Sequence, residues 1–468
     1  MKYLVGLEDV QWRQHGAPVP IVLDSDKLIN GHMLIAGMSG TGKSHQIVNF
    51  LNAASSQGVE CDVFDVHEEL HSVRNSTAVK FSEVTRAGYN PLVLNTDHHS
   101  GGVRKQIGWM VDMVNRTSVR LGPRQESVLR NLLSEVYRTR GCMADNPASW
   151  VKREMTERQF DELTRDRRYD EMRNYYPILR DVISYTERQL KIMRTGSDQR
   201  AVAALERVEK SASRLAGINT KYHKAVSDEE VERYQTQMSA EKDKAIEAYV
   251  EFIRSIETGR EMQDIHRYNN QETLVSVLER LQQLQDGGIF CSNPPDFRGS
   301  PVRVYQIGSL SDDERRLLFY VRAQQILREC MDAGQSTTVK RILLVDEGHL
   351  YYSEDSDNPM NRIAKEGRKF GLGLVIGSQS PTHFSEDFIT NCGAILLTGL
   401  HEQFWDMACR KMRIDPVVLK ATRAREVLSL KMHRNGEAAA RFVSVNVDYG
   451  VVQAGVAKLQ AQRSLAAA

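Results

Sequence analysis

A glycine-rich segment of eight residues constrains the fold of this chain more than any other feature. Gly37 to Ser44 read GMSGTGKS and match, without a gap, the pattern GxxxxGK followed by Ser or Thr. The apolar run HMLIAG precedes the segment, and HQIVNFLNAASSQ follows it with apolar residues at helical spacing. A strand, a tight loop and a helix in this order are the context in which the pattern binds phosphates. We therefore expect an α/β fold that binds a nucleoside triphosphate.

The residues of this loop have separate expected roles. Glycines allow the backbone to wrap around the phosphates with its N–H groups inward, and the helix that begins near Lys43 adds its positive dipole end. Lys43 should reach the β and γ phosphates, and the Ser44 hydroxyl stands at the position that ligates Mg²⁺. The alternative, a chance match in a glycine-rich turn, is disfavoured by the flanking strand and helix. The expected nucleotide-binding residues are Gly37, Ser39, Gly40, Thr41, Gly42, Lys43, Ser44 and His45.

A second strand ends in two acids. The apolar run RILLVDE brings Asp346 and Glu347 to the carboxyl end of a buried strand, the edge at which open α/β sheets bind ligands. We expect Asp346 to hold Mg²⁺ through water and Glu347 to orient and polarise the attacking water. His349 fits a packing or supporting role better than metal ligation. Asp65 and His67 end the strand VFDVH, and either lie near the nucleotide or are ordinary polar groups at a strand end.

The chain divides into regions of different pattern. Residues 1–98 and 287–445 alternate strand-like and helix-like runs, which predicts a mainly parallel sheet with helices on both faces. They are expected to form the first and second parts of one ATPase core. Residues 99–286 are expected to be a helical insertion, and residues 446–468 a C-terminal tail or brace. In the region before that tail, LSLKMHRNGEAAARFVSVNV predicts a β-hairpin turned at Asn435-Gly436.

The insertion is rich in charged residues and long helical runs. From Arg124 to Arg140 the apolar residues share one helical face, namely Val128, Leu129, Leu132, Leu133 and Val136. Residues 149–267 are rich in Glu, Arg, Lys, Gln and Ala, with a narrow apolar face that favours a projecting helical hairpin or coiled coil over a packed domain. A solvated spacer, a partner-docking arm and a DNA-facing clamp are the open interpretations of this segment.

Composition excludes some classes of protein and leaves others open. The chain has 62 basic and 61 acidic side chains, so any contact with DNA must be local rather than a property of the whole surface. No run approaches the roughly 18 apolar residues of a membrane span, and acids stand where a signal peptide would be apolar. We expect a cytoplasmic protein without membrane attachment. The six cysteines form no CxxC pair, which argues against a zinc site or a disulfide framework.

Several segments resemble the HerA and FtsK superfamily of hexameric DNA motors, and most closely HerA-type ATPases. LINGHMLIAGMSGTGKS is similar to the entry of that family's phosphate loop, and VDEGHLYY is similar to its acidic strand with a following histidine. Tyr89 to Leu92, YNPL, resembles a recurring turn after the second strand. The most specific similarity is EGRKFGLGL running into IGSQSP, residues 366–374 and 376–381. The resemblance implies a RecA-like P-loop NTPase core with ATP and Mg²⁺ as cofactors.

The same resemblance implies two further catalytic residues. In that family the segment corresponding to EGRKFG supplies an arginine that acts on the neighbouring subunit's nucleotide, and on this chain that role falls to Arg368. The glutamine that ends the next strand senses the γ-phosphate, a role that falls to Gln379. A guanidinium from a neighbour would make hydrolysis depend on assembly, since it neutralises charge in the transition state. Lys369 and Arg362 are alternatives for the finger, and a surface ion pair is the alternative for Arg368.

The chain also departs from the family. HerA proteins commonly carry an amino-terminal β-barrel that docks a nuclease, and the 36 residues before Gly37 are too few for that barrel. The helical insertion is longer than the family's usual one and is an alternative docking surface. In related motors a terminal segment braces the neighbouring subunit, which is one interpretation of the tail here.

Three functions compete on this basis. The first is an ATP-hydrolysing ring motor, a homo-oligomer for which the resemblance implies a hexamer, that translocates or unwinds double-stranded DNA. It would work with a nuclease or other effector protein in repair or antiviral defence. The second is an ATP-regulated oligomeric scaffold that assembles and activates a partner effector. The third is a DNA-transfer coupling ATPase, which the absence of an anchor disfavours.

Overall fold

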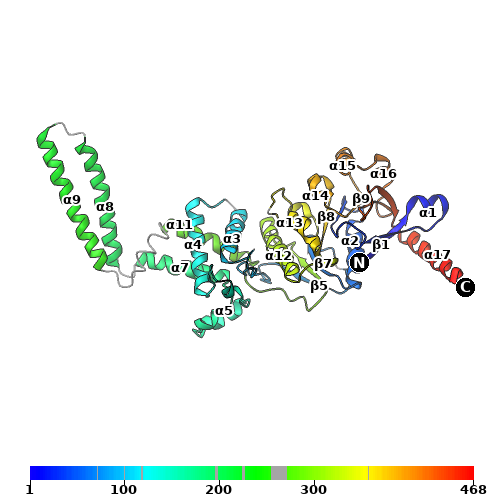
Figure 1. The fold of residues 1–468 in the computed structure, drawn as a ribbon, viewed down its shortest axis with the longest axis horizontal. Coiled ribbons are helices and arrows are strands. Elements are labelled where there is room, and N and C mark those ends of the chain that lie inside the picture. Colours follow the sequence, from blue (N-terminus) through cyan, green and yellow to red (C-terminus); the bar gives the residue numbers. More distant parts are fainter. Residues whose placement is uncertain are drawn as a thin grey trace. The chain divides into compact units, whose positions relative to one another are not determined.

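The computed structural model describes residues 1–70, 72–99, 101–117, 120–195, 199–223, 227–254, 271–356 and 358–467 (Figure 1). The chain forms two compact units. The first combines Met1–Pro91 with Gly287–Ala468, and the second is Leu92–Asp286. The first unit therefore comes from both ends of the chain.

An eleven-stranded sheet organises the first unit, in the order β2-β1-β11-β10-β9-β3-β8-β7-β4-β6-β5. From β9 to β5 each strand is parallel to its neighbour, and from β9 to β2 the neighbours are antiparallel. The described strands are β1 Lys2–Glu8, β2 Pro20–Asp24, β3 Met33–Gly37, β4 Glu60–Asp65, β5 Ser76–Lys80, β6 Val302–Gln306, β7 Ser336–Val345, β8 Phe370–Ser378, β9 Ala394–Gly399, β10 Val427–Met432 and β11 Phe442–Asn446. This architecture confirms the predicted α/β class with a mainly parallel sheet and a RecA-like P-loop core.

Helices cover both faces of the parallel strands, which explains why the central strands β3, β8 and β9 are almost wholly apolar. Side chains alternate between the faces. Ile35, Val63 and Leu344 lie in one core cluster with α2 residues, whereas Phe64 packs edge-on against Phe319 of α12 on the other face. The main helices of this unit are α1 Asp9–His15, α2 Lys43–Ser56, α12 Asp312–Asp332, α13 Pro359–Glu366, α14 Glu386–Thr390, α15 Trp405–Met412, α16 Pro416–Ala421 and α17 Tyr449–Ala467.

The C-terminal hairpin differs from its prediction in the turn. Strands β10 and β11 pair antiparallel, but the ladder ends at Lys431 and Phe442, so a long loop joins them rather than Asn435-Gly436 alone. The reason lies in Asn435, whose backbone N–H donates to the Lys27 carbonyl and whose side chain donates to the Leu28 carbonyl. The Glu437 N–H donates to the Arg434 carbonyl, so the chain does turn at Asn435-Gly436, but within a longer loop that the segment before β3 holds.

The second unit is wholly helical apart from one isolated bridge, in the residues that the structure describes. Its helices are α3 Val103–Thr117, α4 Pro123–Thr139, α5 Glu157–Arg165, α6 Tyr169–Met172, α7 Leu179–Thr195, α8 Gln199–Tyr222, α9 Asp228–Arg254 and α11 Gln271–Asp286. The amphipathic helix predicted from Arg124 is α4, and all five of its predicted apolar residues are buried. A large α-helical insertion is therefore present.

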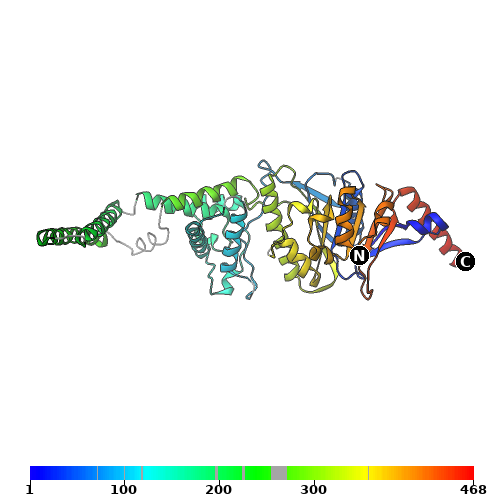
Figure 2. The same cartoon turned by 90° about the horizontal axis from the view of Figure 1, so that it is seen from above.

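Only part of this unit is a hairpin, which corrects the expectation for residues 149–267. Helices α8 and α9 lie side by side along their length (Figure 1 and Figure 2), and Arg207 of α8 pairs with Glu251 of α9. Residues before the hairpin instead pack into a small core of their own, which includes Phe160, Leu163 and Ile178. The sparse apolar pattern concealed this core because few residues form it. The end of the predicted segment, 255–267, lies outside the described residues.

A helix that crosses a bilayer needs about 20 consecutive, mostly apolar residues. Among the described residues, no helix is both long enough and apolar enough to cross a bilayer.

Candidate nucleotide site

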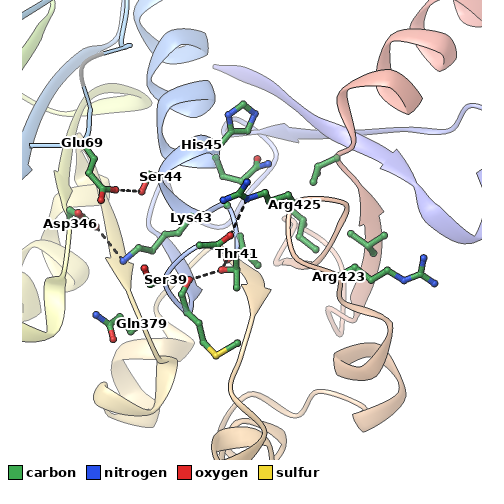
Figure 3. Close-up of a pocket in the computed structure, with 18 of the residues that line it drawn as sticks. Ser39, Thr41, Lys43, Ser44, His45, Glu69, Asp346, Gln379, Arg423 and Arg425 are labelled. Carbon is green, nitrogen blue, oxygen red and sulfur yellow. Dashed lines mark hydrogen bonds and ion pairs between the residues drawn. The ribbon is translucent and has the colours of Figure 1, made fainter. Parts of the chain in front are cut away.

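A cavity of about 850 Å³ opens where β3 and its neighbours end (Figure 3). The sheet order places β8 between β3 and β7, so the loops after these three strands meet at one edge. Lys43, Asp346, Glu347 and Gln379 all line this cavity. The structure thus brings together residues that stand more than 300 positions apart in the sequence.

The phosphate loop has the backbone shape that its sequence predicts. Gly40 and Gly42 have φ angles of +79° and +103°, which side chains with a Cβ rarely adopt. The Thr41 hydroxyl lies 2.7 Å from the Met38 carbonyl, to which it donates, and 2.8 Å from the Thr398 hydroxyl. Helix α2 begins at Lys43, so its N-terminal N–H groups face the cavity. This geometry is suited to an anion.

Lys43 lies between the two acids that end β7. Its Nζ is 2.7 Å from Glu347 Oε1 and 3.6 Å from Asp346 Oδ1. Burial alone raises the pKa of Glu347, but His349 and the Lys43 ammonium outweigh it and hold that pKa at about 2. Burial raises the pKa of Asp346, and the Lys43 ammonium opposes this only in part. Glu347 is therefore an anion at neutral pH.

Histidines surround Glu347 as well. His349 Nδ1 lies 3.3 Å from Glu347 Oε2, and His67 Nε2 lies 3.7 Å from Glu347 Oε1. His67 lines the cavity. Asp65, in contrast, is buried behind it, and its carboxylate accepts the backbone N–H groups of Glu69 and Leu70. Of the two polar residues that end the strand VFDVH, only the histidine faces the cavity.

Ser44 has a partner that the sequence did not predict. Its hydroxyl donates to Glu69 Oε2 at 2.9 Å (Figure 3). Glu69 belongs to the loop after β4, and β4 pairs with β7. No spacing rule links an exposed acid in that loop to the phosphate loop, so only the sheet order could have indicated it.

Arg368 lies far from this cavity, whereas Gln379 lines it. Both flank β8, a strand of nine residues, so at about 3.3 Å per residue they stand roughly 30 Å apart. Arg368 is exposed, and its positive charge helps to lower the pKa of the buried His32. Of the two alternatives, Lys369 is exposed beside Arg368, and Arg362 lies 3.9 Å from Glu366. None of these cations lines the cavity of its own chain.

Two arginines that the sequence did not single out do line the cavity. They are Arg423 and Arg425, in the segment that leads into β10. Arg425 Nε donates to the Gly40 carbonyl at 3.1 Å, and its backbone N–H donates to the Thr41 carbonyl at 3.1 Å (Figure 3). These residues follow no motif, because their position depends on how the last strands fold back onto the sheet.

The donor set fits a triphosphate with a divalent cation. Asp346 Oδ1 is buried and accepts no hydrogen bond from any described residue, and a buried carboxylate oxygen of this kind is costly unless a cation or water satisfies it. The Ser44 hydroxyl and the neighbouring carboxylates supply the oxygen ligands that Mg²⁺ prefers. Opposite them, the Lys43 ammonium and the backbone N–H groups of the loop supply positive charge for phosphates.

Comparisons with known proteins agree with this geometry. A family model described as the central domain of the helicase HerA matches residues 13–221. The DNA double-strand break repair helicase HerA of Pyrococcus furiosus is 32% identical over 71 residues, 14% of this chain and 13% of that protein. The HerA of Saccharolobus solfataricus is 23% identical over 213 residues, 43% of this chain and 37% of that protein.

A solved structure is similar over nearly the whole chain. VirB4 of Thermoanaerobacter pseudethanolicus matches with a TM-score of 0.55 at 13% identity, over 95% of this chain and 96% of that one. This likeness shows the fold. Together the comparisons confirm the predicted resemblance to HerA-type ATPases. The chain spans well under two thirds of the length of the curated relatives that it matches.

Proposed function

We propose that this HerA-like P-loop ATPase hydrolyses ATP, with Mg²⁺, to move along double-stranded DNA as a ring of identical subunits. The observation that carries the proposal is the convergence of the phosphate loop, the acids of β7 and Gln379 on one cavity. DNA is the proposed substrate because the HerA relatives are named as DNA repair helicases. The number of subunits, six in the proposed ring, rests on the family resemblance.

The proposed chemistry assigns each residue one task. Lys43 and the loop N–H groups bind the β and γ phosphates, while Ser44 and Asp346 hold Mg²⁺. The ion would supply positive charge that offsets the charge of the phosphates during transfer. Glu347 orients the attacking water and accepts its proton, a role that requires the ionised form. The Glu347 carboxylate is ionised at neutral pH, as this role requires.

Two further residues complete the proposed site. Gln379 follows β8 directly and lines the cavity beside the acids, which supports a role in sensing the γ-phosphate. Arg368 is proposed to reach the nucleotide of a neighbouring subunit. Its exposure and its distance from its own cavity support an action in trans, since the side chain spans far less than the length of β8. Lys369 and Arg362 remain the alternatives.

Stimulation of hydrolysis by DNA tests the proposal. We expect purified protein to hydrolyse ATP several-fold faster with duplex DNA than without it, at low salt where phosphate contacts are strongest. A Lys43→Ala variant should show neither basal nor stimulated activity, and controls for a contaminating ATPase. Equal turnover with and without duplex would contradict the motor.

The second candidate, an oligomeric scaffold for a nuclease or other effector, has one observation in its favour. On α9 four apolar side chains at helical spacing are exposed, namely Ile246, Tyr249, Val250 and Ile253. Replacing Ile246, Val250 and Ile253 by Ser should abolish a complex with the effector but leave the ATPase rate intact. Three serines at the polar positions Glu229, Glu230 and Arg233 of the same helix provide the matched control. An unchanged complex in the apolar variant would remove this candidate.

A further inference from the structure

The nucleotide cavity has a second wall, formed by the last part of the chain. We propose that this wall is the base-binding half of the site, and that Tyr449 stacks on the adenine base. The inference rests on the proposed ATPase function and adds to it the residues that recognise the nucleoside. Val427, Leu428, Val447, Asp448 and Tyr449 line this wall.

The sheet order fixes the direction in which a bound nucleotide must point. Gln379 and the two acids follow β8 and β7, on one side of β3. The terminal phosphate must face that side, since those residues carry the chemistry. The second wall belongs to β10, β11 and the start of α17, and β9 and β10 lie on the other side of β3. The base therefore points toward the second wall.

Arg425 attaches this wall to the phosphate loop. Its side chain and its backbone N–H donate to the carbonyls of Gly40 and Thr41, consecutive contacts on a loop of fixed shape (Figure 3). The left-handed backbone of Arg425, at φ +64°, turns the chain from that contact into β10. The distance between the phosphate-binding half and the second wall is thus set by direct hydrogen bonds.

The backbone that carries Tyr449 is also well held. Asn446 Oδ1 accepts the N–H of Asp448, and Asp448 Oδ1 accepts the N–H of Val451, which caps the start of α17. Val447, which is half-buried within this segment, and the buried Val427 at the start of β10 are the apolar residues beside it in the cavity lining. A rigid frame of this kind places a ring with little loss of conformational entropy on binding.

The aromatic ring of Tyr449 is exposed to solvent. Its side chain is 78% exposed although it lines the cavity, and the described residues give the ring no stacking partner and the hydroxyl no hydrogen bond. An aromatic face that stays in water at the mouth of a nucleotide site is suited to a base, because every base offers a π face of similar size. The stacked base would in turn cover the ring.

Competition between ATP and inorganic tripolyphosphate tests the inference, because only ATP carries a base. Displacement of a fluorescent ATP analogue would report both affinities in wild type, Tyr449→Ala and Tyr449→Phe. We expect Tyr449→Ala to raise the Kd for ATP about tenfold, as stacking of one base predicts, and to leave the Kd for tripolyphosphate within about twofold. Tyr449→Phe keeps the ring and should keep most of the affinity. Tyr169→Ala, which removes an exposed tyrosine of α6, is the matched control.

Either of two results with Tyr449→Ala would overturn the inference. One is an unchanged ATP affinity in Tyr449→Ala, and the other is an equal loss for ATP and tripolyphosphate, which would indicate a disturbed phosphate loop. The experiment also distinguishes failure of the base-site inference from failure of the ATPase proposal. Wild type that binds ATP and tripolyphosphate equally would reject the base site alone, whereas base-dependent binding without hydrolysis would reject the ATPase proposal alone.

Discussion

At the scale of single residues, the nucleotide site is dominated by the contacts of one lysine. The Lys43 ammonium contacts Glu347 and approaches Asp346, and the ion pair offsets the cost of burying all three charges. A triphosphate would offer the same ammonium several phosphate oxygens instead. Glu347 would then lose its partner and face water with His349 and His67 beside it. Exchange of partners at Lys43 thus links nucleotide binding to Glu347, the proposed general base.

Lys43→Ala and Glu347→Gln should therefore have different effects. Loss of the charged hydrogen bonds in Lys43→Ala should weaken ATP binding by about ten- to a hundredfold. Glu347→Gln keeps the shape of the site and should bind ATP as wild type does, while turnover falls by about 10²- to 10⁴-fold because only water activation is lost. Equilibrium binding and single-turnover hydrolysis separate the two effects. Normal hydrolysis by Glu347→Gln would show that another residue is the base.

His32 should make stability depend on pH. Burial, and secondarily the charge of Arg368, lowers the pKa of this histidine to about 4, and its Nδ1 accepts the Leu374 N–H. In the unfolded chain His32 has an ordinary pKa near 6.5. Between pH 6.5 and pH 4 it is therefore protonated in the unfolded chain but mostly neutral in the folded chain. The contribution of the neutral His32 to the free energy of unfolding is complete above about pH 7. It decreases as the pH falls toward 4, by about 2 kcal/mol between pH 7 and pH 5. Urea unfolding at both pH values should show a smaller decrease in His32→Gln than in wild type, and identical decreases would contradict the assignment.

At the scale of elements, a buried charge cluster joins three strands and a helix. Asp62 of β4 is fully buried and bonds to Arg303 of β6 and Arg341 of β7, while Arg322 of α12 lies 3.8 Å away. Glu329 of α12 pairs with Arg322 and Arg341 and balances part of the charge. Burial opposes ionisation of Asp62, but the three guanidinium groups outweigh it and hold its pKa well below the usual range. These contacts connect the strands and α12 on one face of the sheet.

Asp62→Asn should consequently destabilise the first unit. Removal of the carboxylate leaves the guanidinium groups without their shared acceptor, and breaking a buried ion pair in this way costs about 3 to 5 kcal/mol. Glu437→Gln, which removes an exposed pair with Arg434, should cost less than about 1 kcal/mol. Chemical denaturation of both variants would measure the difference. A loss below about 1 kcal/mol for Asp62→Asn would mean that the cluster is held in other ways.

The elements also show how far sequence reasoning extends. Strands such as HMLIAG and RILLVDE and the helix after Lys43 were predictable, because apolar runs and a motif define them locally. The convergence of Lys43 and Glu347 also followed, since parallel strands end at one edge, whereas Gln379 was singled out by the family resemblance. Glu69 and Arg425 were not predictable, because pairing between distant strands brings them to the loop. Tyr449 was missed for the same reason, and only the resemblance singled out Arg368.

At the scale of the whole molecule, the account requires more than one copy of the chain. The proposed finger and the cavity stand at opposite ends of β8, so no single subunit can bring Arg368 to its own nucleotide. A closed ring resolves this, since each subunit receives a finger from one neighbour and gives its own to the other. With a net charge of +1, the chain would hold DNA through a few local contacts repeated around that ring.

Mixing of two inactive variants tests whether Arg368 acts on the nucleotide of a neighbouring subunit. Arg368→Ala keeps the phosphate loop and lacks the finger, whereas Lys43→Ala lacks the loop lysine and keeps the finger. Each alone should hydrolyse almost no ATP in the presence of duplex DNA. An equal mixture should recover about a quarter of wild-type turnover, since in a randomly assembled ring about one junction in four joins an intact loop to an intact finger. A mixture as inactive as its components, or full activity of Arg368→Ala as a monomer, would contradict the account.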